Sequence, residues 1–187
     1  GSLLGASDNT TDKNITISHV IADTHLTVSN QDARIGGLIG IAGNSSYQLN
    51  LSISNVSQNA VINGASGSDV GGLIGEIEDA TIQMDTLSLN TSMSGLTNVG
   101  GLVGKSLNTD AKFQNITQSA TIHSTFSTAN SSDYIGGLVG YFQQEDSTDE
   151  FISNLTISGI HADITMTSSI LASNRGGLVG QARNSNV

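Results

Sequence analysis

The chain has 187 residues, and its 6 Lys and Arg against 16 Asp and Glu give a net charge of −10 with neutral histidines. This excess of negative charge argues against nucleic acid and anionic membrane surfaces as main partners. Cysteine, proline and tryptophan are absent, which excludes disulfide frameworks, thiolate metal sites and thiol nucleophiles.

No apolar run approaches the length of a membrane-spanning helix, the longest being of the kind seen at residues 38–42. We therefore expect no membrane insertion. The chain does not open with a basic segment followed by an apolar one, and Gly1-Ser2 resembles a cloning remnant. We expect residues 1–187 to be one repeat domain, excised from a longer chain that supplies flanking domains.

Five copies of one short motif organise the sequence: IGGLIG at 35–40, VGGLIG at 70–75, VGGLVG at 99–104, IGGLVG at 135–140 and RGGLVG at 175–180. Spacings of this size are typical of stacked supersecondary units. Paired glycines permit tight bends and close backbone approach, so we expect the motif to be a structural corner with its leucine pointing inward. The residues concerned are Gly36, Gly37, Leu38, Gly71, Gly72, Leu73, Gly100, Gly101, Leu102, Gly136, Gly137, Leu138, Gly176, Gly177 and Leu178.

Upstream of each motif, apolar residues recur at fixed offsets, which predicts short strands joined by bends within residues 15–26, 51–62, 82–93, 111–122 and 155–166. Three apolar columns result: Ile17, Ile53, Met84, Phe113, Ile157; Val20, Val56, Leu87, Ile116, Ile160; and Leu26, Ile62, Met93, Ile122, Met166. A polar column, Asp23, Asn59, Asn90, Ser119 and Asp163, is predicted to mark a turn and to form a side-chain ladder.

The abundance of Thr, Ser, Ile, Val, Asn and Gly disfavours helix. The sequence predicts an all-β protein, a parallel β-helix or β-solenoid of about five coils, about 25 Å long at the usual strand spacing. A β-propeller is the rival, but its blades contain more aromatic residues and vary less in length.

The motif [IVR]-G-G-L-[IV]-G resembles the GLUG repeat of secreted and surface-attached bacterial proteins. That family includes adhesin-like proteins and the non-catalytic N-terminal region of immunoglobulin A-cleaving metallopeptidases. The resemblance implies a β-solenoid at the bacterial surface or in a secreted protein and implies no catalytic residues. Arg175 departs from the pattern, which suggests that its unit lies at an end or meets another domain.

Chemistry-bearing patterns are weak. Gly104-Lys105-Ser106 is one residue short of a phosphate-binding P-loop, and the other four copies lack the lysine. The four histidines show no metal-ligand spacing, and H-E-x-x-H is absent. We predict no catalytic residue, no metal site and no cofactor.

Aromatic and acidic residues gather around the fourth motif, where insertions separate the repeats. Loops of this kind are where binding sites usually lie. The candidate binding residues are Tyr134, Tyr141, Phe142, Glu145, Asp146, Asp149 and Glu150. Calcium binding by the acidic run and a solvated loop remain alternatives, because the order of carboxylates does not match a known calcium loop. Deleting residues 143–150 should leave the fold intact.

These features favour a non-catalytic structural or adhesion segment of an extracellular bacterial protein, one that binds host protein or glycan or acts as a spacer. The alternatives are a substrate-recognition module of a secreted metallopeptidase and a carbohydrate-active β-helix enzyme.

Overall fold

The computed structural model describes residues 3–7, 13–29, 33–43, 48–64, 69–95, 97–124, 134–144, 153–168 and 174–187. The described residues form fourteen β-strands and no helix, as predicted. The strands are β1 (Leu4–Ser7), β2 (Lys13–Val28), β3 (Arg34–Gly36), β4 (Ile39–Ala42), β5 (Leu49–Gly64), β6 (Asp69–Gly71), β7 (Ile74–Gly95), β8 (Asn98–Gly100), β9 (Val103–Ser124), β10 (Tyr134–Gly136), β11 (Val139–Gln143), β12 (Leu155–Ser168), β13 (Asn174–Gly176) and β14 (Val179–Arg183).

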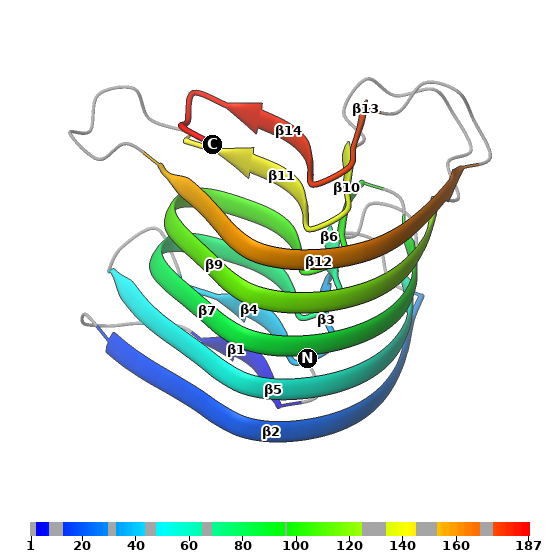
Figure 1. Ribbon diagram of the computed structural model, residues 1–187, viewed down its shortest axis with the longest axis horizontal. Coiled ribbons are helices and arrows are strands. Elements are labelled where there is room, and N and C mark those ends of the chain that lie inside the picture. The colour runs from blue at the N-terminus through cyan, green and yellow to red at the C-terminus, as the bar shows by residue number, and fades with distance from the viewer. Residues whose placement is uncertain are drawn as a thin grey trace.

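Strands from successive repeats pair in parallel to form stacked sheets (Figure 1). The larger sheet has nine strands and contains the path β1-β4-β7-β9-β11-β14, with β2 and β5 joining it through β7 and with β12 pairing to β9. The second sheet contains the five short strands that precede the glycine motifs, in the order β13-β10-β8-β6-β3. Parallel neighbours that are distant in sequence explain why the repeat period, rather than local hairpins, organises the chain.

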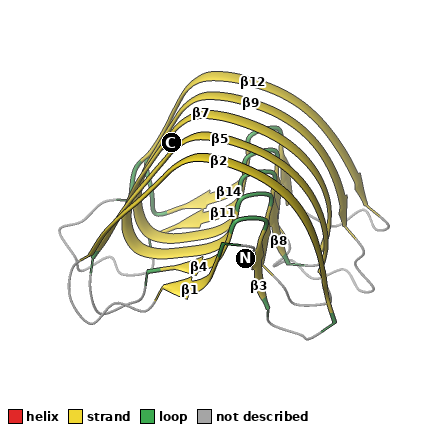
Figure 2. Cartoon of the chain, turned by 90° about the horizontal axis from the view of Figure 1, so that it is seen from below, coloured by secondary structure: helices red, strands yellow, loops and turns green. Residues whose placement is uncertain are grey.

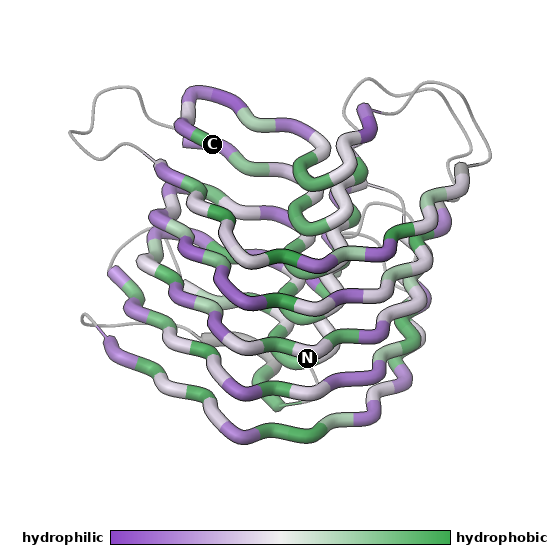
Figure 3. The backbone as a smooth tube through the Cα atoms, in the orientation of Figure 1, coloured by the Kyte–Doolittle hydropathy of each residue, from purple (hydrophilic) through white to green (hydrophobic). Residues whose placement is uncertain are grey.

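The long strands β2, β5, β7, β9 and β12 lie in register, and the residues of each predicted column pair with one another. Ile17 pairs with Ile53, Ile53 with Met84, Met84 with Phe113 and Phe113 with Ile157. The two other apolar columns follow the same pairing. Side chains alternate between the two faces of each strand, and buried and exposed positions alternate along much of β5 and β7. Hydrophobic and hydrophilic residues alternate along the long strands in the same way (Figure 3). The amphipathic spacing therefore determines the register.

The predicted polar ladder is present at its first three positions. Asn59 Nδ2 donates to Asp23 Oδ1 at 2.8 Å, and Asn90 Nδ2 donates to Asn59 Oδ1 at 3.4 Å. These side chains are exposed, so they satisfy one another on the outer face instead of forming a buried polar site.

The long strands bend at a different column from the one predicted. His19, Asn55, Thr86, Asn115 and Gly159 all have positive φ values, from 52° to 63°. This column lies four residues before the Asp23 column, which is in regular ladder pairing. A left-handed residue interrupts the strand and turns it, and the long strands consequently arch over the rest of the structure (Figure 2). The prediction of a bend was correct, but its position was wrong.

Beneath this arch the glycine motifs turn inward (Figure 2). Leu38, Leu73, Leu102 and Leu138 are at most 1% exposed, and each amide donates to the carbonyl of the next leucine in the row. Leu178 continues the row by accepting from Leu138, but it is 44% exposed. The expected interior position of Leu178 is thus wrong, because β14 pairs only with β11 in the described part of the chain.

The second glycine of each of the first four motifs lies where two units approach each other closely. A Cβ on Gly37 would lie 2.3 Å from the carbonyl oxygen of Gly72, and a Cβ on Gly101 would lie 2.1 Å from that of Gly137. Buried glutamines tighten the same place: Gln58 Nε2 donates to the Gly72 carbonyl at 3.2 Å. Such contacts leave no room for a side chain, which is why glycine recurs there.

Candidate functional site: the charged seam beside the glycine corners

Two columns of side chains face each other where the strands enter and leave the glycine corners. We call them the charged seam: Arg34, Asp69, Asn98, Tyr134 and Asn174 on the entering strands, and Ile41, Glu76, Lys105, Tyr141 and Gln181 on the leaving strands. Glycines between the two strands bring their backbones together. A Cβ on Gly75, for example, would lie 2.6 Å from the Gly40 carbonyl oxygen and 2.5 Å from the Ile35 nitrogen.

Glu76 is the centre of the charges in the seam. Its side chain is 3% exposed and accepts from Arg34 Nε and, at 2.9 Å, from Lys105 Nζ. A buried carboxylate requires such partners, since desolvation opposes its charge. Arg34 and Lys105 reach Glu76 from the two neighbouring units, so the three side chains connect three successive repeats.

Asp69 lies on the entering strand opposite Glu76 and is 8% exposed. Burial raises the pKa of its carboxyl to about 6; the hydrogen bond from Asn98 lowers the pKa, and the nearby Glu76 charge raises it further. Asn98 Nδ2 lies 2.6 Å from Asp69 Oδ1. Two carboxyl groups lie in one buried cluster, and the pKa of one of them is raised to about 6, an arrangement that can hold and move a proton.

Two units beyond Asp69 and Glu76, the seam contains Tyr134 and Tyr141, two of the predicted binding residues. Their rings are stacked with centroids 4.7 Å apart. Burial raises the pKa of the Tyr141 hydroxyl, which donates to Gln143 Oε1. The structure therefore brings these two tyrosines together, with Tyr141 only 9% exposed.

The other predicted binding residues do not join this pair. Phe142 is 1% exposed and lies in the hydrophobic core, because neighbouring residues of a strand point to opposite faces. The prediction that Phe142 contributes to a binding site is therefore wrong, because its side chain is not accessible to a ligand. Glu145, Asp146, Asp149 and Glu150, together with most of the preceding insertion, lie outside the described residues.

The proposed loop deletion also needs correction at its first two residues. Gln144 is 7% exposed, its amide donates to the Arg183 carbonyl, and its Oε1 accepts from the Ser153 amide at 3.0 Å. Gln143 pairs with Arg183 in the sheet. Both residues belong to the folded structure, so a deletion that tests the loop alone must begin at Glu145.

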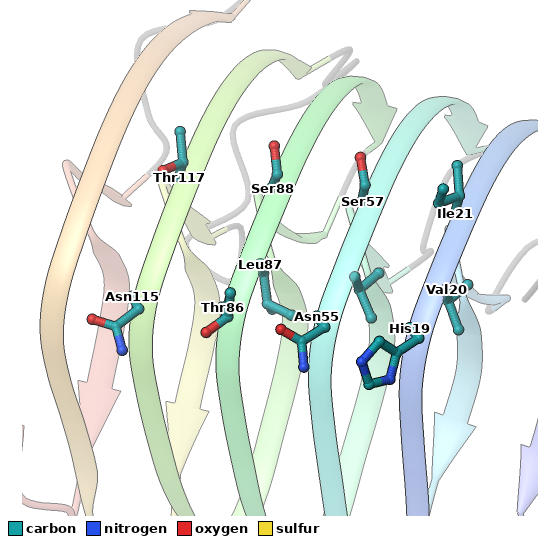
Figure 4. Close-up of a pocket in the computed structure, with 11 residues that line it drawn as sticks. His19, Val20, Ile21, Asn55, Ser57, Thr86, Leu87, Ser88, Asn115 and Thr117 are labelled. Carbon is teal, nitrogen blue, oxygen red and sulfur yellow. The ribbon is translucent and has the colours of Figure 1, made fainter.

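A shallow groove of about 490 Å³ crosses the outer face of the long strands at their bend (Figure 4). One edge consists of the left-handed column and the other of the column two residues later, in which Ile21 is 88% exposed. The labelled edge residues are His19, Asn55, Thr86, Asn115, Ile21, Ser57, Ser88 and Thr117. Its polar groups are amides, hydroxyls and one imidazole, an arrangement able to donate and accept hydrogen bonds but with no fixed charge pair.

The described residues contain no group of three or more His, Cys, Asp or Glu side chains placed to hold a metal ion. Within that same part of the chain, no helix is long and apolar enough to cross a membrane.

The sequence analysis did not identify the seam. Its signal was available, since positions one residue before and one after each six-residue motif hold polar, charged or aromatic residues in nearly every copy. The near-match to a P-loop draws attention to Lys105 but not to the residues that face it across the corner. The two columns of the seam can be recognised in the sequence only if each glycine motif is taken to be a corner, with one column before it and the other after it.

Comparison with protein-family models found no match to the chain. Searches among curated proteins and among solved structures likewise found no match.

Proposed function

We propose that the chain is a parallel β-solenoid of about five coils, related to GLUG-repeat proteins, and a non-catalytic structural or adhesive segment of an extracellular bacterial surface protein. In this proposal it holds flanking domains apart and presents its outer surface to host protein or glycan.

One observation carries the proposal: polar side chains repeat in columns and bond mainly to their counterparts in neighbouring units. The Asp23–Asn59–Asn90 ladder and the ion pairs of Glu76 both run along the stacking direction. Such bonds connect one repeat to the next and leave few converging groups for chemistry on a substrate. This arrangement supports mechanical continuity along the stack.

The test is attachment without turnover. The purified chain, fixed to beads, is applied to epithelial cells, extracellular matrix proteins and mucin glycans, and saturable retention on one of these surfaces is expected. A variant lacking residues 145–150 tests the loop, and a Ser57→Arg variant tests the outer groove, because Ser57 is exposed on a sheet face.

Loss of retention in one variant assigns the binding surface. Release of peptide or sugar fragments by the purified chain would contradict the proposal that the chain is non-catalytic. Absence of retention on all of the tested surfaces would contradict the proposed adhesive role.

A further inference from the structure

The third glycine corner places an amine and a carboxamide on opposite sides of one tight turn. Asn98 enters the corner and Lys105 leaves it. In the adjacent unit the equivalent residues are Tyr134, which pairs with Asn98, and Tyr141, which pairs with Lys105. The rings of Tyr134 and Tyr141 stack with centroids 4.7 Å apart, so these two positions face each other across their corner. We infer that the equivalent positions, Asn98 and Lys105, face each other in the same way.

Each of the two groups touches its own buried carboxyl. Lys105 Nζ lies 2.9 Å from Glu76 Oε1, and Asn98 Nδ2 lies 2.6 Å from Asp69 Oδ1. The charge of Lys105 also acts on the Asp69 carboxyl, which places the amine within electrostatic range of the acid that contacts the amide. The four side chains thus form one connected cluster.

Asn98 has an unusual feature for a structural asparagine. Its residue is 6% exposed, and its buried Oδ1 has no hydrogen-bond partner. Buried carbonyl oxygens are nearly always satisfied, and an orphaned one is a candidate for a chemical role. The nitrogen of the same amide contacts the Asp69 carboxyl, so an acid lies beside the group that would leave if the amide carbon were attacked.

Glu76 has two cationic partners, so the Lys105 side chain can lose its charge without leaving Glu76 unpaired. Glu76 accepts from both Arg34 and Lys105, so it retains one cationic partner if Lys105 becomes neutral. A buried carboxylate that keeps a single well-placed partner avoids the large penalty of an unpaired charge. The cluster can tolerate the conversion of Lys105 from an ammonium to an amide.

We propose that Lys105 and Asn98 form an intramolecular amide cross-link, with Glu76 and Asp69 transferring the protons. Glu76 accepts a proton from the Lys105 ammonium, and the free Nζ attacks Asn98 Cγ to form the new Nζ–Cγ bond. Asp69, in its protonated form, donates its proton to Nδ2, the nitrogen it contacts, as the Cγ–Nδ2 bond breaks. Nζ, which still carries one proton too many for an amide, returns a proton to Asp69. The departing ammonia takes the proton held by Glu76 and leaves as ammonium. Desolvation and an adjacent base are the usual means of activating a lysine amine.

The intact mass of the chain tests the proposal directly. The folded protein is expected to be lighter than its sequence by one ammonia, and trypsin should fail to cleave after Lys105. Lys105→Arg retains a cation for Glu76 but cannot form the amide, so its mass should match its sequence. Lys112→Arg, on the same strand β9, is the matched control and should still lose ammonia.

A second source of ammonia loss is excluded by design. Asn63 precedes Gly64, and an Asn-Gly pair can lose ammonia by cyclising on its own backbone, so the measurement is made in an Asn63→Gln background. Asp69→Asn should slow the loss of ammonia. A full-sequence mass after prolonged incubation of the folded protein, or an ammonia loss that persists in Lys105→Arg, would overturn the proposal.

Discussion

Replacing Gly101 with alanine adds one methyl group at the closest approach of two repeat units. The new Cβ would lie 2.0 Å from Gln118 Nε2 and 2.1 Å from the Gly137 carbonyl oxygen. The glutamine side chain can move, but the carbonyl belongs to the backbone of the next unit. Restoring an ordinary contact requires the two backbones to separate by about 1 Å, against a strand spacing of about 4.8 Å.

The cost follows from what must move. Overpacking in a close-packed interior costs about 1–3 kcal/mol. Separation also weakens the hydrogen bond from the Gly101 amide to the Gly136 carbonyl, now 3.3 Å, which is worth about 1 kcal/mol. We expect a loss of about 3 kcal/mol in the free energy of unfolding, or a decrease of about 10 °C in Tm for a chain of this size. The Gly101→Val substitution should cost more, because a branched side chain needs more space.

Gly177 provides the matched control, because it occupies the same place in the last motif and a Cβ there meets nothing within 4 Å. Urea denaturation followed by circular dichroism at the β-sheet band measures both variants. Gly177→Ala should stay within about 0.5 kcal/mol of the wild type, as surface substitutions usually do. Equal stabilities for the two variants would show that close approach between units is not the reason for the glycines.

Three further predictions concern single features. Thr86 is a β-branched residue at φ 57°, so Thr86→Asn should stabilise the protein by about 1 kcal/mol in thermal denaturation, whereas Asn115→Thr should destabilise it. Folding raises the pKa of Asp69 from 3.8 to about 6, so the folded state holds this proton more tightly, and stability should increase by up to about 3 kcal/mol as pH falls from 7 to 4. Asp69→Asn should remove that pH dependence in denaturant titrations and be more stable than wild type at pH 7. Deleting residues 145–150 should leave Tm within a few degrees, whereas a deletion that includes Gln144 should lower it markedly.

The strand columns could be predicted because they depend on a local periodicity. Alternation of apolar and polar residues fixes which face of a strand is buried, and a parallel stack then aligns equivalent positions of each repeat. Phe113 and Met84, for instance, pair as their sequence offsets require. The inward leucines followed from the same argument.

The position of the bend could not be predicted in the same way. The left-handed column contains His19, Asn55, Thr86, Asn115 and Gly159, which share no chemical class. Asparagine and glycine favour this backbone conformation, but threonine and histidine do so less, and tertiary stacking holds them there. The Asp23 column, with its uniform polar residues, therefore attracted the prediction although it is regular strand.

The seam could not be predicted from the repeats alone because some of its contacts cross the glycine corner from one column to the other. Arg34, Glu76 and Lys105 come from three different units and two different strand rows. An alignment of the repeats places Glu76 beside Lys105 but leaves Arg34 in the other column. Recognition of the seam required the two sides of the glycine corner to be in contact, which depends on the backbone packing at Gly40 and Gly75.

A pair of introduced cysteines measures the parallel, in-register stacking most directly, and the absence of native cysteine makes the experiment clean. Ser57 pairs with Ser88, and Ser88 pairs with Thr117 two strands away from Ser57 (Figure 4). Cysteines at 57 and 88 lie about 4.8 Å apart at Cα, within disulfide range, whereas cysteines at 57 and 117 lie about 10 Å apart and outside it. Under mild oxidation the folded 57/88 variant should form an intramolecular disulfide and the 57/117 variant should not. Cross-linking in the 57/117 variant alone, or in neither, would contradict the stacked architecture.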